Sequence, residues 1–69
     1  MAPHQLRVIA EKNALDDKLF ALKVFLHGPV FLTLPGDERR RLRRQTEVME
    51  EYSAILAERI VAFSDPYAQ

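Results

Sequence analysis

The sequence has no cysteine, only two glycines and no excess of either charge, since ten basic residues balance ten acidic ones. Without cysteine the chain forms neither a disulfide nor a thiolate metal site. Its only histidines, His4 and His27, stand far apart, so we expect no metal and no cofactor. Two glycines are too few for a glycine-rich phosphate loop. The zero net charge disfavours general nucleic-acid binding, which normally needs a basic excess.

Long apolar runs are also missing. No stretch approaches the roughly 18–20 apolar residues that cross a membrane, because Lys18 and Lys23 interrupt the most apolar segment. Residues 1–7 lack the apolar stretch of a signal peptide. We therefore expect a soluble, cytoplasmic protein without membrane contact.

The chain is short, with 69 residues, of which 48% are hydrophobic and 29% charged. This composition is typical of a globular and not a disordered chain. Below roughly 70–80 residues, however, one hydrophobic core rarely stabilises a fold alone. Small domains compensate with disulfides, a metal or oligomerisation. Because the first two are excluded, the sequence predicts a single domain, residues 1–69, that oligomerises.

A first helix is predicted over residues about 4–27. Leucines spaced by 4, 3 and 4 positions form one helical face, which Val8 and Lys12 extend toward the amino terminus. Gly28 and Pro29 end the helix. The connector, residues 28–36, is expected to be irregular or 3₁₀ in structure, with Phe31 and Leu34 pointing inward. The four leucines are Leu15, Leu19, Leu22 and Leu26.

A second helix is predicted over residues about 37–63, followed by a frayed tail, residues 64–69. It carries a row with alternating spacings of 3 and 4, as in a coiled-coil seam. The predicted fold is therefore an all-α antiparallel two-helix hairpin. Apolar residues off the two rows, among them Val48 and Ile55, need further cover, which identical chains in a helical homo-oligomer supply. The second row is Leu42, Gln45, Met49, Tyr52, Leu56, Arg59 and Phe63.

Polar residues interrupt both predicted rows. Gln45 and Arg59 lie in the second row and Lys12 in the first, and burying them is costly unless they are hydrogen-bonded. They are either structural, setting the register or extending to solvent, or functional, with Arg59 binding an anion such as phosphate. In an antiparallel hairpin Lys12 and Asn13 lie opposite Arg59, with Arg7 nearby. The sequence thus predicts an anionic ligand site there.

Other charged residues favour structural interpretations. The arginines between Arg39 and Arg44 spread around more than half of the helix, and acidic residues follow, with Arg43 placed to pair with Glu47. We interpret this run as a solvated face, with a phosphate-binding patch as the alternative. Asp16 and Asp17 diverge by about 100° on a helix, so they form no catalytic dyad, and ion pairs to Lys12 or to a neighbouring chain are expected.

No catalytic constellation is present. Neither Ser53 nor Ser64 stands in the glycine-flanked context of an activated nucleophile. The spacing of arginines and lysine that all-α chorismate mutases use along the first helix is also missing. We therefore expect a protein that is not an enzyme, with no catalytic residues.

Four residue patterns, which combine helical apolar spacing with a few polar residues, cover most of the chain. They are HQxRVIxEKxxLDxKL (residues 4–19), LxxFL (22–26), FxxLP (31–35) and LxRQxxxMxxYxxILxxRIxxF (42–63). This pattern resembles the small phage-encoded helical-hairpin proteins that include the anti-CBASS cyclic-nucleotide sponges. The resemblance covers residues 4–63.

The resemblance implies a compact helical homo-oligomer, typically a hexamer. Such proteins bind cyclic dinucleotides, and in some members cyclic trinucleotides, between protomers and perform no chemistry on them. They sequester the second messengers of bacterial CBASS immunity and so keep its effector switched off. By this resemblance the protein works in the cytoplasm of an infected bacterial host, with no DNA or RNA partner.

The family's dinucleotide pocket has an aromatic residue followed by asparagine on the first helix, and a lysine about one helix length later. Asn13 matches the asparagine, whereas Lys12 stands in place of the aromatic residue and His27 in place of the lysine. Arg59 matches a basic position suited to a separate trinucleotide pocket. A second possibility is an oligomeric adaptor that binds a host protein through an apolar helical face. A third is nucleic-acid binding through residues 39–44.

Overall fold

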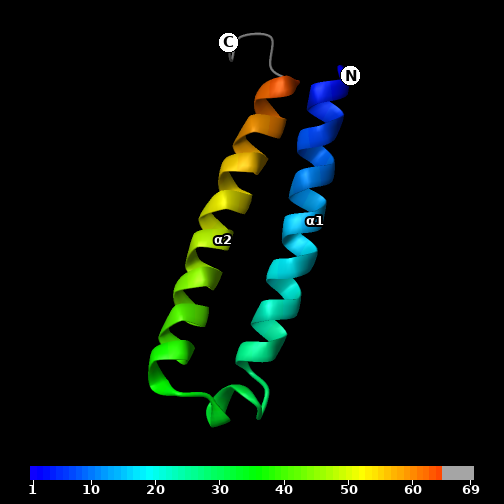
Figure 1. Cartoon of the computed structure of the whole chain (residues 1–69). Helices are drawn as coiled ribbons and strands as arrows, with labels where there is room; N and C mark the ends of the chain where they lie inside the picture. Colours follow the sequence, from blue (N-terminus) through cyan, green and yellow to red (C-terminus); the bar gives the residue numbers. More distant parts are fainter. Residues whose placement is uncertain (65–69) are drawn as a thin grey trace.

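The computed structural model describes residues 1–64 and consists of two long helices joined by a short turn (Figure 1). Helix α1 spans Pro3–Leu26, the 3₁₀ helix η1 spans Phe31–Thr33, and α2 spans Gly36–Phe63. The helices run antiparallel, so the start of α1 lies beside the end of α2. The predicted all-α hairpin with a 3₁₀ connector is confirmed, and both helices begin one residue earlier than predicted. Of the predicted frayed tail, residues 64–69, the structure describes Ser64, whose N–H donates to the Val61 carbonyl at the end of α2, and residues 65–69 lie outside the described part.

The ends of the helices follow from local sequence. At the start of α1 the Ala2 N–H donates to Gln5 Oε1 at 2.9 Å, which is one half of a capping box. After α1 the Gly28 N–H donates to the Phe25 carbonyl at 3.0 Å, and Pro29 cannot continue the helix. At the start of α2, Asp37 and Glu38 lie in the first turn, where negative charge is favourable with the helix dipole.

Phe31 closes the turn end of the hairpin. Its side chain is buried, and its ring meets that of Phe25 edge to face, with ring centroids 6.4 Å apart. The Arg43 guanidinium lies over the same ring, 5.0 Å from its centroid. Leu34 is half-buried. The inward positions predicted for the connector are therefore observed, and Phe31 is the one fully packed.

The interhelix seam combines the predicted row of α1 with a row of α2 that differs from the predicted one. On α1, Val8 and Leu19 are buried and Lys12 is half-buried. On α2, Thr46 and Leu56 are buried, whereas Gln45 and Arg59, which were predicted inside the row, are exposed. The buried and half-buried residues that form the α2 seam are Leu42, Thr46, Met49, Ser53, Leu56, Ile60 and Phe63.

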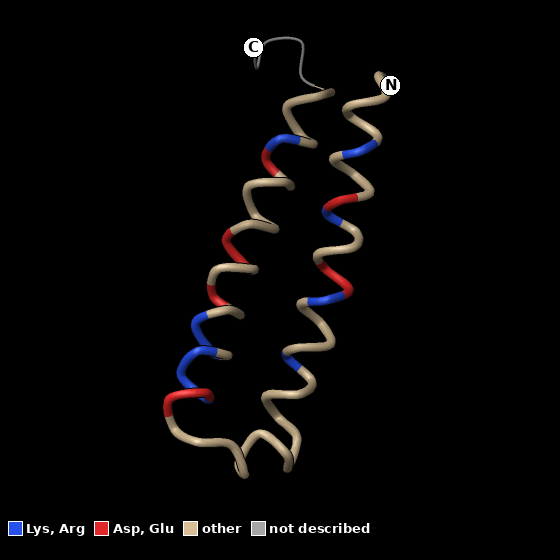
Figure 2. The backbone as a smooth tube through the Cα atoms, viewed as in Figure 1, with Lys and Arg blue, Asp and Glu red and all other residues tan. Residues whose placement is uncertain are grey.

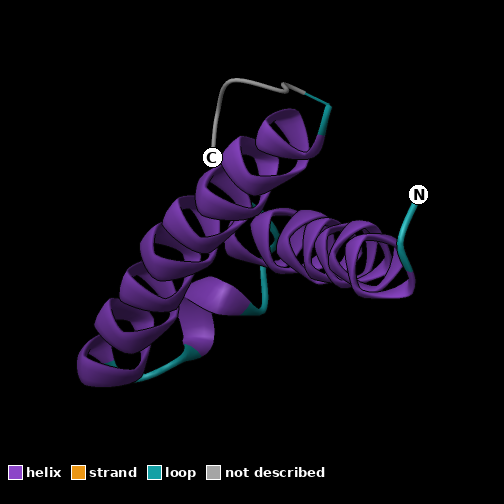
Figure 3. Cartoon of the chain, turned by 90° about the horizontal axis from the view of Figure 1, so that it is seen from above, coloured by secondary structure: helices purple, strands orange, loops and turns teal. Residues whose placement is uncertain are grey.

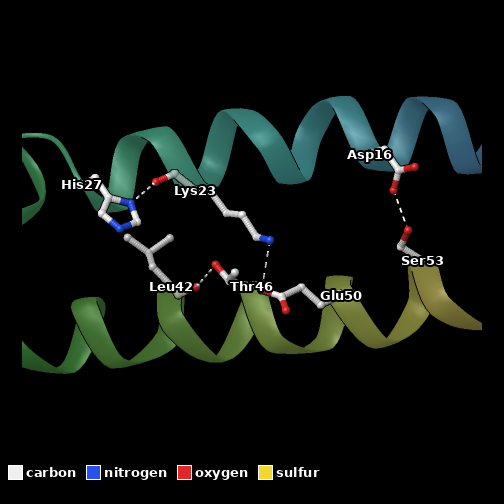
Figure 4. A network of polar contacts seen from close by, with 7 residues as sticks. All are labelled: Asp16, Lys23, His27, Leu42, Thr46, Glu50 and Ser53. Carbon is white, nitrogen blue, oxygen red and sulfur yellow. Dashed lines mark hydrogen bonds and ion pairs between the residues drawn. The ribbon is translucent and has the colours of Figure 1, made fainter.

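Two overlapping rows explain this difference. Both alternate 3 and 4 residues and share four positions, so spacing alone does not choose between them. The observed row buries hydroxyls that find partners at once: Thr46 Oγ1 donates to the Leu42 carbonyl at 3.0 Å, and Ser53 Oγ donates to Asp16 Oδ1 at 2.5 Å (Figure 4). The alternative row buries the amide of Gln45 and the guanidinium of Arg59, whose donors are harder to satisfy.

The hairpin is long and thin, measuring 49 × 17 × 15 Å with a radius of gyration of 15.6 Å. A compact domain of this length has a radius of about 11 Å. Seen from above, the two helix axes are inclined to each other, so each helix covers only one side of its neighbour (Figure 3). Within residues 1–64 no helix is both long and apolar enough to cross a membrane.

Candidate ligand-binding site

Lys12 lies in the seam and has its charge compensated. Its Nζ is 2.6 Å from Asp16 Oδ2, and Asp16 also accepts the hydrogen bond from Ser53 on α2. The hydrogen bond from Lys12, and next the one from Ser53, lower the pKa of the Asp16 carboxyl below its ordinary value. The ion pair that the sequence predicted between Asp16 and Lys12 is confirmed. It gives the seam lysine a structural partner.

Two arginines occupy the open end of the hairpin. Arg59 and Arg7 are exposed, and within residues 1–64 neither forms an ion pair. The contact between the His4 and Phe63 rings, with centroids 6.3 Å apart, aligns the start of α1 with the end of α2. This alignment places Arg59 near the level of Arg7 and Lys12 along the hairpin, and an anion site there stays a prediction.

The remaining predicted residues lie elsewhere. Asn13 is exposed, and its position on α1 lies about 140° around the helix axis from the middle of the seam, so it faces away from α2. His27 stands at the turn end, where its Nδ1 is 2.8 Å from the Lys23 carbonyl (Figure 4). Fourteen residues separate it from Asn13, which is roughly 21 Å along a helix. One chain therefore does not bring all the predicted residues together.

The basic run has partners that the sequence did not indicate. Arg41 forms ion pairs with two nearby carboxylates. Its Nε lies 2.8 Å from Glu38 Oε1, and its Nη1 lies 3.6 Å from Asp37 Oδ2. The hydrogen bond that Arg41 donates to Glu38 is the main reason that the pKa of Arg41 is raised. Arg43 stacks on Phe31, and the predicted pair with Glu47 is not among the ion pairs of residues 1–64. Figure 2 shows the basic segment of α2 followed by an acidic one.

A concave surface lies on the side of α2 that faces neither α1 nor the turn. An open groove of about 540 Å³ is lined by Glu47, Val48, Glu51, Tyr52 and Ile55. It adjoins a smaller groove of about 310 Å³ lined by Arg41, Arg44, Gln45, Val48 and Met49. We call these two grooves together the α2 outer face. Periodicity identified Val48 and Ile55 as surplus apolar residues but placed Tyr52 in the seam, so it missed the continuous stripe.

The grooves and the predicted ligand residues have different chemistry. The α2 outer face is apolar with charged rims, which suits a protein surface, whereas the arginines at the open end suit an anion. Among residues 1–64 no three His, Asp or Glu side chains are grouped as metal ligands.

The match to a known protein family extends over the whole hairpin. The family model described as Sequestin matches residues 2–62, a range that includes both helices and the connector. The comparison with curated proteins found no match, and neither did the comparison with solved structures.

Proposed function

The chain belongs to the Sequestin family, and from this membership we propose that it sequesters a small ligand without converting it. The family name itself denotes sequestration. We propose further that the ligand is a cyclic oligonucleotide second messenger of bacterial CBASS immunity, a cyclic dinucleotide or trinucleotide. The protein is then a phage counter-defence factor that acts in the cytoplasm of the infected host. The family match over residues 2–62 is the observation that carries this proposal.

The proposed working form is a homo-oligomer, and by the resemblance a hexamer. The exposed apolar surface supports an assembly, because only four apolar side chains of the described hairpin are buried: Val8, Leu19, Phe31 and Leu56. Separation of the candidate ligand residues also supports it. Since Asn13 and His27 lie roughly 21 Å apart along one chain, a pocket that uses both combines residues of two chains.

We assign ligand contacts to the five residues predicted from the sequence. Arg59 and Arg7 have exposed guanidinium groups with no ion pair in the described hairpin, and such groups bind phosphate oxygens in a bidentate manner. Asn13 and His27 offer further hydrogen bonds at a junction between chains. Lys12 contributes through whichever Nζ hydrogens its bond to Asp16 leaves free.

Calorimetric titration of the oligomer with a panel of cyclic di- and trinucleotides tests the proposal. We expect saturable binding and intact nucleotide on recovery. Arg59→Ala is expected to weaken binding at least about tenfold, since charge-assisted hydrogen bonds contribute about 1.5–3 kcal/mol. Arg40→Ala, which removes another exposed arginine of α2, is the matched control. If no nucleotide binds to an oligomer verified by light scattering, the proposal is wrong.

The α2 outer face favours a second candidate function, an adaptor that binds a host protein through this apolar surface. Affinity capture from a bacterial lysate distinguishes the two functions. A stoichiometric protein partner whose binding survives Arg59→Ala, together with no response to cyclic nucleotides, favours the adaptor.

A further inference from the structure

We propose that two copies of the chain associate through the α2 outer face in an antiparallel contact with two-fold symmetry. Val48 lies on the symmetry axis, and Arg44 of each copy pairs with Glu51 of the other. The inference rests on the homo-oligomeric assembly proposed above and specifies one of its interfaces.

The centre of the proposed contact is an apolar stripe that α1 does not cover. Val48, Tyr52 and Ile55 keep 61%, 41% and 47% of their surfaces exposed. Their spacings of 4 and 3 place them on one side of α2, as in the seam of a coiled coil. A second helix laid along this stripe removes the three side chains from water, which is favourable by the hydrophobic effect.

The two grooves of this face are complementary to each other. They share Val48, but Arg41 and Arg44 line the smaller groove, whereas Glu47 and Glu51 line the larger one. Rotation by 180° about an axis through Val48 brings the basic groove of one copy onto the acidic groove of the other. A patch that is complementary to itself under such a rotation is the requirement for a symmetric dimer contact.

The ion pair follows from the helix geometry. Arg44 precedes Val48 by four residues and Glu51 follows it by three, so at 100° per residue both lie on the same flank of the stripe. In an antiparallel pair of helices such flanks meet, and the axis at Val48 places Arg44 opposite Glu51 of the second copy. Neither residue has an ion pair within residues 1–64.

The charges also select the orientation. Figure 2 shows the basic segment of α2 on the turn side of the acidic segment. A parallel arrangement places Arg44 beside Arg44 and Glu51 beside Glu51, which is repulsive. The antiparallel arrangement replaces both repulsions with two equivalent attractions.

Disulfide trapping tests the position of the axis. The chain has no cysteine, so Val48→Cys introduces one thiol per copy, and under mild oxidation we expect a covalent dimer in high yield. Val24→Cys on α1, whose native side chain is 58% exposed and so comparable to Val48, is the matched control and is expected to remain largely uncrosslinked. Equal yields for the two variants, or no dimer with Val48→Cys, overturn the proposal.

Charge reversal tests the ion pair. We expect Arg44→Glu and Glu51→Arg each to raise the dissociation constant of the assembly at least about tenfold in analytical ultracentrifugation, and the double variant to restore it to within about threefold. Circular dichroism verifies that each exposed substitution leaves the helices intact. If the double variant is as weak as the single ones, the pairing is wrong.

The interface between copies and the binding of nucleotide are tested independently of each other. If none of these substitutions changes the assembly and the oligomer still binds nucleotide, the proposed interface is wrong and the proposed sequestration is supported. The expected trapping and charge-reversal results in a protein that binds no nucleotide refute the ligand and leave the interface standing. A host protein that occupies the α2 outer face while Val48→Cys gives no homodimer refutes the interface in favour of the adaptor.

Discussion

Asp16 is the residue through which the two helices make a polar contact inside their seam. It accepts a hydrogen bond from Lys12 one turn earlier and another from Ser53 on α2. Both donors stabilise the ionised form of the carboxylate, so its pKa is lowered. Serine is small enough to lie in the seam, and the carboxylate satisfies its hydroxyl.

Acid is therefore expected to destabilise the hairpin through Asp16. A carboxyl with a lowered folded-state pKa contributes stability above its unfolded value, about 3.9, and this stability is lost as the pH falls through the folded value. A carbon-13 NMR titration is expected to show the lowered pKa. Lys12→Met raises it more than Ser53→Ala does, since the Lys12 bond is the larger cause. Asp16→Asn is the control and removes this part of the acid dependence of unfolding.

Leu56 is the most completely enclosed side chain of the hairpin, with none of its surface exposed. Leu56→Ala is expected to lower the free energy of unfolding by about 2–5 kcal/mol, because it removes buried methyl groups and leaves a cavity. Urea denaturation followed by circular dichroism measures the change. Val61→Ala, at a position 69% exposed, serves as the control, with an expected change within about 0.5 kcal/mol. Similar losses for the two variants contradict the described seam.

At the scale of the helix, the seam shows where periodicity suffices and where it does not. The leucine row of α1 was predicted correctly, because only one row of that helix is continuously apolar apart from Lys12. On α2 two rows share Leu42, Met49, Leu56 and Phe63, and the sequence-based choice placed Gln45 and Arg59 inside. Because both side chains are exposed, their polar groups are available to a ligand and do not set the register of the two helices from inside the seam.

A pair of neighbouring substitutions tests which row is buried. Thr46→Asp places a carboxylate at a buried position of the seam and removes the hydrogen bond to the Leu42 carbonyl, so it is expected to cost about 1–3 kcal/mol. Gln45→Asp adds the same side chain on the exposed side and is expected to cost about 0.5 kcal/mol at most. Thermal unfolding of the two variants side by side measures the difference. Equal losses, or a larger loss for Gln45→Asp, indicate the other row.

At the scale of the whole molecule, the hairpin is too thin to enclose most of its apolar residues. Large apolar side chains remain exposed on both helices, including Leu6, Phe20 and Val24 on α1 and Val48 on α2. Such exposed surface on a small protein normally marks an interaction site. The α2 outer face accounts for one such site, and Leu6 and Phe20 of α1 are available for further contacts between copies.

If association supplies the missing core, stability depends on protein concentration. Binding that involves only the folded state raises the midpoint of thermal unfolding as the concentration of the partner increases. We expect the midpoint to rise by several degrees when the concentration is increased about a hundredfold. A midpoint independent of concentration, in a species of 8.0 kDa by light scattering, contradicts an oligomer stabilised in this way.

Local signals along the chain were sufficient to predict the helices and the turn. Apolar spacing and Gly28 with Pro29 are local signals, and they located the two helices, the turn and the buried Phe31. Which row of α2 faces α1 depends on contacts between the helices, because the free energy that separates two equally spaced rows comes from partners across the hairpin. Ser53 lies half-buried in the seam because Asp16 accepts its hydrogen bond there, and Arg59 and the Val48 stripe stay exposed as a consequence.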